Sequence, residues 1–212
     1  MDLNEKFVIT ISREVGSGGH TVGKMLAGKL GVRFCDKQVM HELMQKFGLT
    51  KYEIERIKAK KKSWLGDFFD KVAQVARGEV YLQSSPRPVN AQVTANEIAD
   101  AETEVLKQLA SEGSCVITGR SGFSILADEP NKIDVFIRSS LESRIERVAR
   151  KQNITPEQAE ILIKDIDETR ENYVRRISGR SRYDSRNYDL VLNMDKISEA
   201  DAADLIIDFA KH

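Results

Sequence analysis

The chain has 212 residues, enough for one α/β domain with a sizeable core and a small appendage. Its 33 basic and 33 acidic residues balance, which argues against a general nucleic-acid binder or a protein of membrane surfaces. The N-terminal sequence MDLNEKF has no signal-peptide core and no apolar stretch is long enough to span a bilayer, so we expect a cytoplasmic protein.

The first element in chain order is a strand that runs into a glycine-rich turn. Residues 7–11 read FVITI and suit a buried parallel strand, and Gly16, Gly18 and Gly19 follow. Apolar residues then recur at helical spacing over 22–30. A strand, a glycine loop and a helix present backbone N–H groups and the positive end of a helix to an anion, so this segment predicts a phosphate-binding loop.

This loop lacks the lysine that ends a P-loop of the form GxxxxGK[ST]. A literal match to GxxxxGK covers residues 18–24, but Met25 follows it and cannot bind a metal ion. We prefer the register in which the helix begins at Gly19-His20, because that keeps Val22 on the apolar face of the helix. Gly19 then stands at the lysine position, and the lysine of the literal match faces solvent. The alternative is a glycine-rich turn that binds no ligand.

Four further apolar runs predict strands at 32–35, 115–118, 133–137 and 190–192. Five short strands that alternate with helices predict an α/β fold, with a five-stranded parallel sheet and helices on both faces. Two of the strands contain the cysteines, which are predicted to be reduced core residues. Good N-caps mark the predicted helix starts at Asp36, Ser140, Thr155 and Ser198, and long helices are predicted over 95–109 and from Thr155 to about Ile177.

The middle of the chain, over residues 50–90, has a different pattern. A charge run, KAKKK, lies at 58–62, an amphipathic helix with an aromatic face is predicted at 64–75, and residues 83–90 predict a loop. The aromatic face is expected to pack on the core or to form a homodimer interface, with a surface for a foreign partner as the weaker alternative.

Arginines follow the carboxyl ends of predicted strands and helices. Gly119-Arg120 follows the third strand, where ligands of open α/β sheets bind, and a guanidinium there can grip a phosphate. The alternative is a structural ion pair between Arg120 and an acid such as Asp128. Further along, Asp167, Arg170 and Tyr173 share one face of a predicted helix.

The segment 178–188, SGRSRYDSRNY, predicts a basic loop. Mobile basic loops close over phosphates and exclude water, so we expect a functional role for Arg180 and Arg182. Arg175 and Arg176 precede this loop and are interpreted as part of a solvated charged helix face.

Taken in order, these segments resemble the cytidylate-kinase-like family, a branch of the nucleoside monophosphate kinases. The motifs that carry the resemblance are SREVGSGG, CVITGRSGFSIL, DVFIRSSLESRIERV, DETR and NYDLVLN. The match runs from about residue 7 to residue 210 and is weakest over 50–90. It implies a P-loop kinase core (1–36 and 113–212), a helical acceptor-binding insert (about 37–112) and a lid (about 165–188).

The resemblance also implies roles for single residues. The donor phosphates and a metal ion, the latter through the Thr21 hydroxyl, are assigned to Gly16, Ser17, Gly18, Gly19, His20 and Thr21. The substrate-binding residues are predicted to be Asp36, Lys37, Arg120, Asp167 and Tyr173, and the catalytic residues Arg13, Arg170, Arg180 and Arg182. Arg13, beside the loop, is expected to replace the missing lysine. Kinases of the family carry another arginine four residues before the Asp-x-x-Arg, where this chain has Ile163.

The sequence therefore supports two functional hypotheses. The first is a phosphotransferase that moves the γ-phosphoryl group of ATP, with Mg²⁺, to CMP, dCMP or a related small acceptor. The second is a nucleotide-sensing pseudokinase that signals through lid closure to a partner or a homodimer. Neither hypothesis includes a nucleic acid or a membrane as a partner.

Overall fold

The computed structural model describes residues 1–59 and 93–212, so the aromatic face predicted at 64–75 and the loop predicted at 83–90 lie outside the described residues. The strands are β1 (Val8–Arg13), β2 (Arg33–Cys35), β3 (Cys115–Thr118), β4 (Lys132–Arg138) and β5 (Leu190–Asn193). The helices are α1 (Gly19–Leu30), α2 (Lys37–Phe47), α3 (Lys51–Ala59), α5 (Ala95–Ser111), α6 (Gly122–Ile125), α7 (Leu141–Gln152), α8 (Pro156–Ser178) and α9 (Glu199–Ala210), with a 3₁₀ turn, η1, at Ser185–Asn187.

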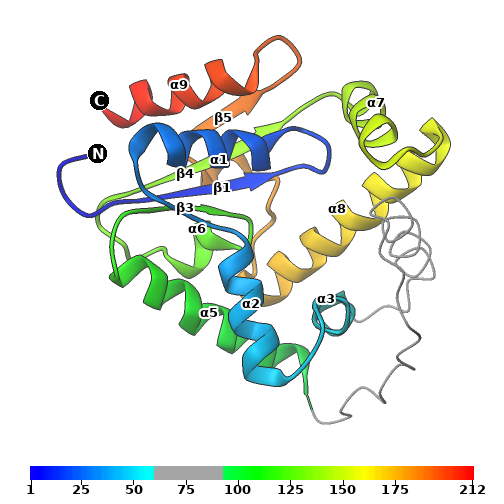
Figure 1. Cartoon of the computed structure of the whole chain (residues 1–212), viewed down its shortest axis with the longest axis horizontal. Coiled ribbons are helices and arrows are strands. Elements are labelled where there is room, and N and C mark those ends of the chain that lie inside the picture. The colour runs from blue at the N-terminus through cyan, green and yellow to red at the C-terminus, as the bar shows by residue number, and fades with distance from the viewer. Residues whose placement is uncertain (60–92) are drawn as a thin grey trace.

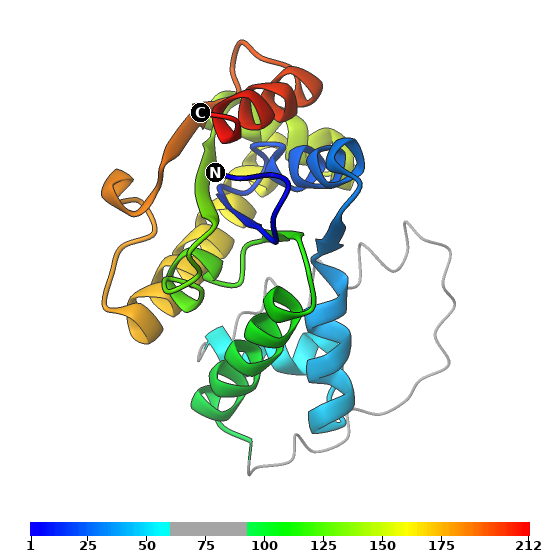
Figure 2. The same cartoon turned by 90° about the vertical axis from the view of Figure 1, so that its left-hand side faces the viewer.

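The strands form one parallel sheet of five strands in the order β2-β3-β1-β4-β5, which confirms the predicted fold class. Helices α1 and α9 lie over one face, and α2, α5 and α6 lie on the other side (Figures 1 and 2). Since all strands are parallel, their carboxyl ends meet at one edge, and the β1–α1 and β3–α6 turns both leave from it.

Alternation along the strands separates two apolar cores. Ile9, Ile11 and Val135 pack with α1 and α9, whereas Val8 and Ile117 pack with α2 and α5 on the other face. Cys35 and Cys115 are both fully buried and free, as predicted for core cysteines. A third, smaller cluster joins α7 to α8.

The helix starts largely follow the predicted caps. The Thr155 side chain accepts from Gln158 N in a capping box with Pro156 in the first turn, and Ser140 and Ser198 cap α7 and α9. Asp36 stands at the N-cap position of α2, as predicted, but its carboxylate makes no capping hydrogen bond. None of the helices in the described ranges has the length and apolar character needed to cross a lipid bilayer.

Candidate functional site

The turn between β1 and α1 leaves backbone N–H groups free at the start of a helix. Gly16 and Gly18 have φ of 83° and 88°, which glycine adopts without a steric penalty, and α1 begins at Gly19, as the preferred register predicts. In residues 1–59 and 93–212, no protein acceptor takes the N–H groups of Gly16, Gly18, Gly19 and His20. Together with the positive end of α1, these amides suit an anion such as a phosphate.

Ser17 differs from its neighbours in the loop. Its N–H donates to Glu14 O at 3.3 Å and its hydroxyl to the same oxygen at 2.9 Å, so Ser17 stabilises the turn itself. Thr21 lies in the first turn of α1, and its N–H donates to Gly18 O at 2.8 Å. Thr21 is partly exposed at this helix start, and its role beside the phosphates and a metal ion stays a prediction.

In the literal GxxxxGK match, packing explains the second glycine, Gly23, without a role in phosphate binding. A Cβ on Gly23 would lie 3.0 Å from both the Phe34 ring and the Thr118 methyl group, so the missing side chain lets α1 approach the sheet closely. Lys24, the lysine of that match, is exposed, as expected.

The side chain of Arg13 crosses the start of α1 toward the end of β3. A Cβ on Gly19 would lie 2.6 Å from Arg13 Cβ, and a Cβ on Gly119 would overlap the Arg13 Nη1 atom. Burial and the nearby charge of Arg170 lower the pKa of Arg13 well below its ordinary value. An anion placed between the loop and Gly119 would offset this repulsion, which favours the predicted cationic role of Arg13.

Asp167 holds the glycine loop from the side of α8. Its Oδ1 accepts from Val15 N at 3.1 Å and from Arg182 Nη1 at 3.4 Å, and its Oδ2 accepts from Arg144 Nη1 at 2.7 Å. Both carboxylate oxygens therefore have protein partners, and Asp167 positions the loop. Its direct contact with an acceptor stays a prediction.

The two arginines of the predicted lid have different surroundings. Arg182 is only 3% exposed, and besides its contact with Asp167 it donates to the carbonyl oxygen of Arg13. Tyr188 Oη in turn donates to Arg182 O at 2.7 Å. This placement differs from the expected mobile side chain. Arg180 is exposed, and its guanidinium has no partner within the described parts of the chain.

The turn after β3 has an unusual backbone. Gly119, Arg120 and Ser121 have φ of 74°, 58° and 55° in succession. For the two residues that are not glycine, the left-handed conformation costs on the order of 1 kcal/mol each. Strain of this kind persists where the surroundings hold it and clusters at functional sites. The hydroxyls of Thr118 and Ser121 beside it are buried and have no hydrogen-bond partner among the residues described.

Arg120 is paired with two acids that the sequence interpretation did not identify. Its Nη1 lies 3.2 Å from Glu55 Oε1 of α3 and 3.3 Å from Glu102 Oε1 of α5. The structural alternative, a pair with Asp128, is therefore wrong in its partner. Burial alone would lower the pKa of Arg120, but Glu102, Glu55 and Asp36 together raise it, so the guanidinium is firmly charged.

Glu102 of α5 connects α3, α8 and the turn after β3. Its side chain is fully buried and accepts from Lys58 Nζ at 2.9 and 3.0 Å, from Tyr173 Oη, and from Arg120. The Lys58 ammonium lies 4.1 Å from the centre of the Tyr173 ring. Burial and the charge of Glu102 raise the pKa of Tyr173, which keeps the hydroxyl protonated as a donor. Tyr173, a predicted substrate-binding residue, is thus committed to Glu102.

Arg170 lies near Arg13 and Arg120 and interacts electrostatically with both. Its side chain is 34% exposed, and its Nη1 lies 3.9 Å from Asp167 Oδ1 without a hydrogen bond. Burial, followed by the charge of Arg182, lowers the pKa of Arg170 to about 10. Arg13, Arg120 and Arg170 come from three different elements and interact electrostatically with one another, so their charges lie near one another at this edge of the sheet.

Two further arginines of α8 have distinct partners. Arg175 is exposed and pairs with Glu171 one turn away, as expected for a solvated helix face. Arg176 departs from this expectation, since both its terminal nitrogens donate to Lys58 O at 3.2 Å and its guanidinium lies 5.2 Å from the centre of the Tyr173 ring.

His20 and Asp36 border the loop on the side of β2. His20 Nδ1 lies 3.4 Å from Asp36 Oδ2, and the imidazole ring meets Phe34 edge-on with ring centres 5.3 Å apart. Lys37 begins α2, so its backbone adjoins this group, and its role in substrate binding stays a prediction. Within the described residues, no three His, Cys, Asp or Glu side chains lie together in a way that could hold a metal ion.

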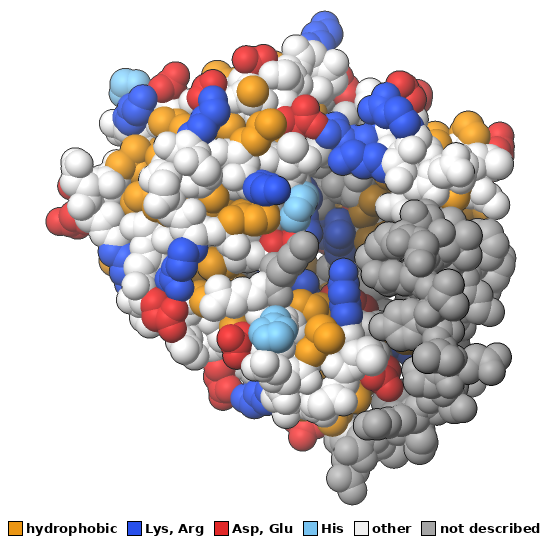
Figure 3. All heavy atoms as spheres, in the orientation of Figure 1, with side chains coloured by type: hydrophobic (Ala, Val, Ile, Leu, Met, Phe, Trp, Pro, Cys, Tyr) orange, Lys and Arg blue, Asp and Glu red, His pale blue; other side chains and the backbone are white. Residues whose placement is uncertain are grey.

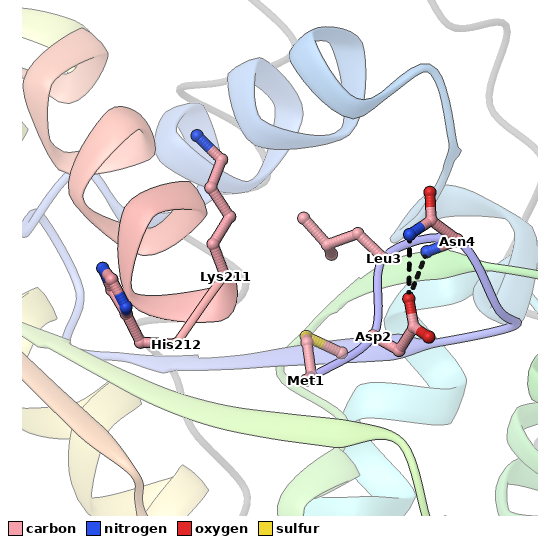
Figure 4. Close-up of a pocket in the computed structure, with 6 residues that line it drawn as sticks. All are labelled: Met1, Asp2, Leu3, Asn4, Lys211 and His212. Atoms are coloured by element: carbon pink, nitrogen blue, oxygen red, sulfur yellow. Dashed lines mark hydrogen bonds between the residues drawn. The ribbon is translucent and has the colours of Figure 1, made fainter.

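The space-filling view shows Lys and Arg side chains gathered around a hollow in the middle of one face, with a histidine beside it (Figure 3). A separate pocket lies where the chain begins and ends (Figure 4), lined by Met1, Asp2, Leu3, Asn4, Lys211 and His212. This pocket is at the end of the sheet where β1 starts, away from the carboxyl edge that carries the glycine loop (Figure 1).

Comparison with known proteins agrees with this geometry. The family model of the cytidylate kinase-like family matches residues 8–196. A cytidylate kinase of Sulfurisphaera tokodaii is 25% identical over 203 residues, which are 94% of this chain and 92% of that protein. Among solved structures, an uncharacterized protein from Eubacterium ventriosum is similar with a TM-score of 0.67 and 24% identity over 97% of this chain and 99% of that one. A shikimate kinase from Acinetobacter baumannii in complex with shikimate has a TM-score of 0.51 and 21% identity over 95% of this chain and 91% of that one.

Proposed function

The chain belongs to the cytidylate kinase-like family and has the fold of small-molecule P-loop kinases, and from this premise we propose that it transfers the γ-phosphoryl group of ATP to CMP, dCMP or a related phosphorylated acceptor. The observation that carries the proposal is the set of free N–H groups at the start of α1, which faces the same carboxyl edge as Arg120. A donor phosphate and an acceptor phosphate would meet between these two turns.

The donor side of the site consists mainly of backbone. The amides of Gly16, Gly18, Gly19 and His20 bind the β- and γ-phosphates, and the buried ion pairs of Asp167 keep the loop in place. The fit is supported by the unpaired N–H groups of these residues, and Gly16 also lets the loop pack closely on α7, since a Cβ there would lie 2.9 Å from Arg144 O. Thr21 would hold Mg²⁺ through its hydroxyl, and phosphates and water would supply the other oxygen ligands that this ion prefers. When bound, the ion neutralises charge on the donor phosphates.

The acceptor side consists of side chains. Arg120 and Arg170 would hold the acceptor phosphate, and Arg13 would stand between donor and acceptor, where charge spreads during transfer. A new bond forms between the γ-phosphorus and an acceptor phosphate oxygen, while the bond to the β,γ-bridging oxygen breaks and leaves its electron pair on ADP. The protein supplies positioning and charge and no covalent nucleophile.

A nucleotide sensor is the second candidate. It is favoured by two substitutions, Gly19 at the place of the loop lysine and Ile163 at the place of an arginine of the kinases. Both changes lower transition-state stabilisation while the N–H groups that bind phosphates remain.

The two candidates can be separated with one set of assays. ADP release is measured across a panel of nucleoside monophosphates, and ATP binding is measured by calorimetry on the same protein. Turnover with CMP or dCMP above the rate of ATP hydrolysis supports the phosphotransferase. Tight ATP binding without turnover on any acceptor rejects it in favour of the sensor.

A further inference from the structure

The two carboxylates that pair with Arg120 differ in exposure and in how firmly they are held. The Glu55 side chain is 46% exposed, whereas that of Glu102 is fully buried, and both lie within 3.3 Å of the same nitrogen, Nη1. We propose that Glu55 is a displaceable counter-ion that occupies the anion position on Arg120 until the phosphate of an acceptor replaces it. This inference rests on the proposed function and names a device that regulates its acceptor site.

Glu102 cannot take this displaceable role. Three donors besides Arg120 fix its two oxygens, namely the Lys58 ammonium, at 2.9 and 3.0 Å, and the Tyr173 hydroxyl. Moving Glu102 would leave the buried Lys58 ammonium without its counter-charge, which is strongly unfavourable. Glu102 is therefore a permanent partner that orients Arg120 from the protein side.

Glu55 has the properties of an exchangeable ligand. In the described residues its one hydrogen-bond partner is Arg120, at 3.2 Å, and it reaches that partner from the third helix of the chain, α3, with nearly half of its side chain in solvent. Burial opposes its charge, but Lys58, Arg120 and Arg170 outweigh this effect and lower the pKa of Glu55. A carboxylate is thus attracted to the place where three cations converge, as a phosphate would be.

The pairing of Glu55 with Arg120 makes the acceptor site selective for ligands that carry a negative charge. A phosphate dianion carries more charge than one carboxylate and offers more acceptor oxygens, so it can replace Glu55 on Arg120 with a net gain. A neutral acceptor offers no such replacement, and the charged Arg120 stays paired with its two acids. Glu55 also lowers the apparent affinity for the correct ligand, since only the fraction of molecules with Arg120 released can bind it.

The test uses inorganic phosphate as the probe, so it is independent of turnover. Calorimetry compares the wild type with Glu55→Gln and with Glu146→Gln, which removes the same charge from a side chain of α7 that is 78% exposed. We expect Glu55→Gln to bind phosphate about three- to fivefold more tightly, as for the loss of a half-exposed ion pair, and Glu146→Gln to bind it as the wild type does. Melting temperatures confirm that both variants are folded.

A crystal structure of the wild type with phosphate provides the second measurement. We expect a phosphate oxygen on Arg120 and the Glu55 carboxylate beyond hydrogen-bond distance, while Glu102 is unmoved. Equal phosphate affinity of the wild type and Glu55→Gln, or a phosphate on Arg120 beside an undisplaced Glu55, overturns the inference. Absence of kinase turnover, by contrast, would reject only the proposed function.

Discussion

The side chain of Arg13 fills the space that a side chain at Gly19 would need. The Cβ that any other residue would bring to Gly19 falls 2.6 Å from Arg13 Cβ, closer than two such atoms can stand. With this backbone, a lysine at position 19 and the arginine at position 13 therefore exclude each other.

This arrangement predicts that the lysine cannot be restored by a single change. Gly19→Lys should lower the melting temperature and weaken ATP binding, because the new side chain collides with Arg13. Arg13→Gly alone should slow turnover by about a hundredfold, as the loss of one transition-state cation does. The double variant Arg13→Gly with Gly19→Lys should recover both stability and ATP affinity relative to Gly19→Lys. Tighter ATP binding by Gly19→Lys alone, at unchanged melting temperature, would show that the two side chains do not compete.

The arginines of the 178–188 segment should separate into different roles. Arg182→Ala should destabilise the protein by roughly 1.5–3 kcal/mol, because it removes one buried partner of Asp167, which keeps its pairing with Arg144. Arg180→Ala should leave stability unchanged and lower kcat with little effect on ATP affinity. Arg186→Ala is the matched control, since its side chain is 87% exposed and pairs with Asp184. Urea unfolding and steady-state kinetics provide the measurements, and equal loss of stability in Arg180→Ala and Arg182→Ala would contradict the assignment.

Glu102 should be sensitive to the loss of its charge. Glu102→Gln leaves the Lys58 ammonium buried without a counter-charge, so we expect a loss of roughly 3–5 kcal/mol in the free energy of unfolding. Adding Lys58→Met to that variant removes the unpaired charge and should restore part of the loss. A second change that only adds to the first would mean that the Lys58–Glu102 pair is not the source of the effect.

Asp195 gives the protein a pH dependence at the acid end. Hydrogen bonds from the Ser139 hydroxyl and the Ser140 N–H lower the pKa of Asp195 to about 2, from 3.8. A lowered pKa in the folded state means stability that is present above about pH 4 and is lost as the pH falls through about 2. The melting temperature of Asp195→Asn should therefore lie below that of the wild type at pH 6, and the gap should narrow as the pH falls toward 2. Asp100→Asn controls for the loss of one surface charge, and a gap that widens on acidification would refute the assignment.

Much of the fold followed from local patterns. The β-branched run at residues 7–11 and the glycines after it placed β1 and the start of α1 correctly, because buried strands and helix starts both depend on near neighbours in sequence. The order of the strands did not follow from the sequence, since it depends on which strands pair across long crossovers.

The candidate site was only partly predictable for the same reason. Arg120 was found because it follows a strand, but its acids lie 65 and 18 residues away along the chain. Glu102 did leave a signal, since it falls within the apolar face of its helix beside Ile98 and Leu106, where a carboxylate requires a partner. Lys58 left none, because it begins a charge run that is typical of a solvated surface.

The neighbouring thiols of Cys35 in β2 and Cys115 in β3 can report how often this part of the sheet opens. The neighbouring Cys115 thiol lowers the pKa of Cys35, yet both sulfurs are shut off from solvent. They are the chain's two cysteines, so a thiol reagent can label the native protein only when this edge of the sheet opens. The rate of thiol labelling, measured with and without phosphate, would therefore report how often β2 and β3 open to solvent and whether a bound ligand suppresses that opening.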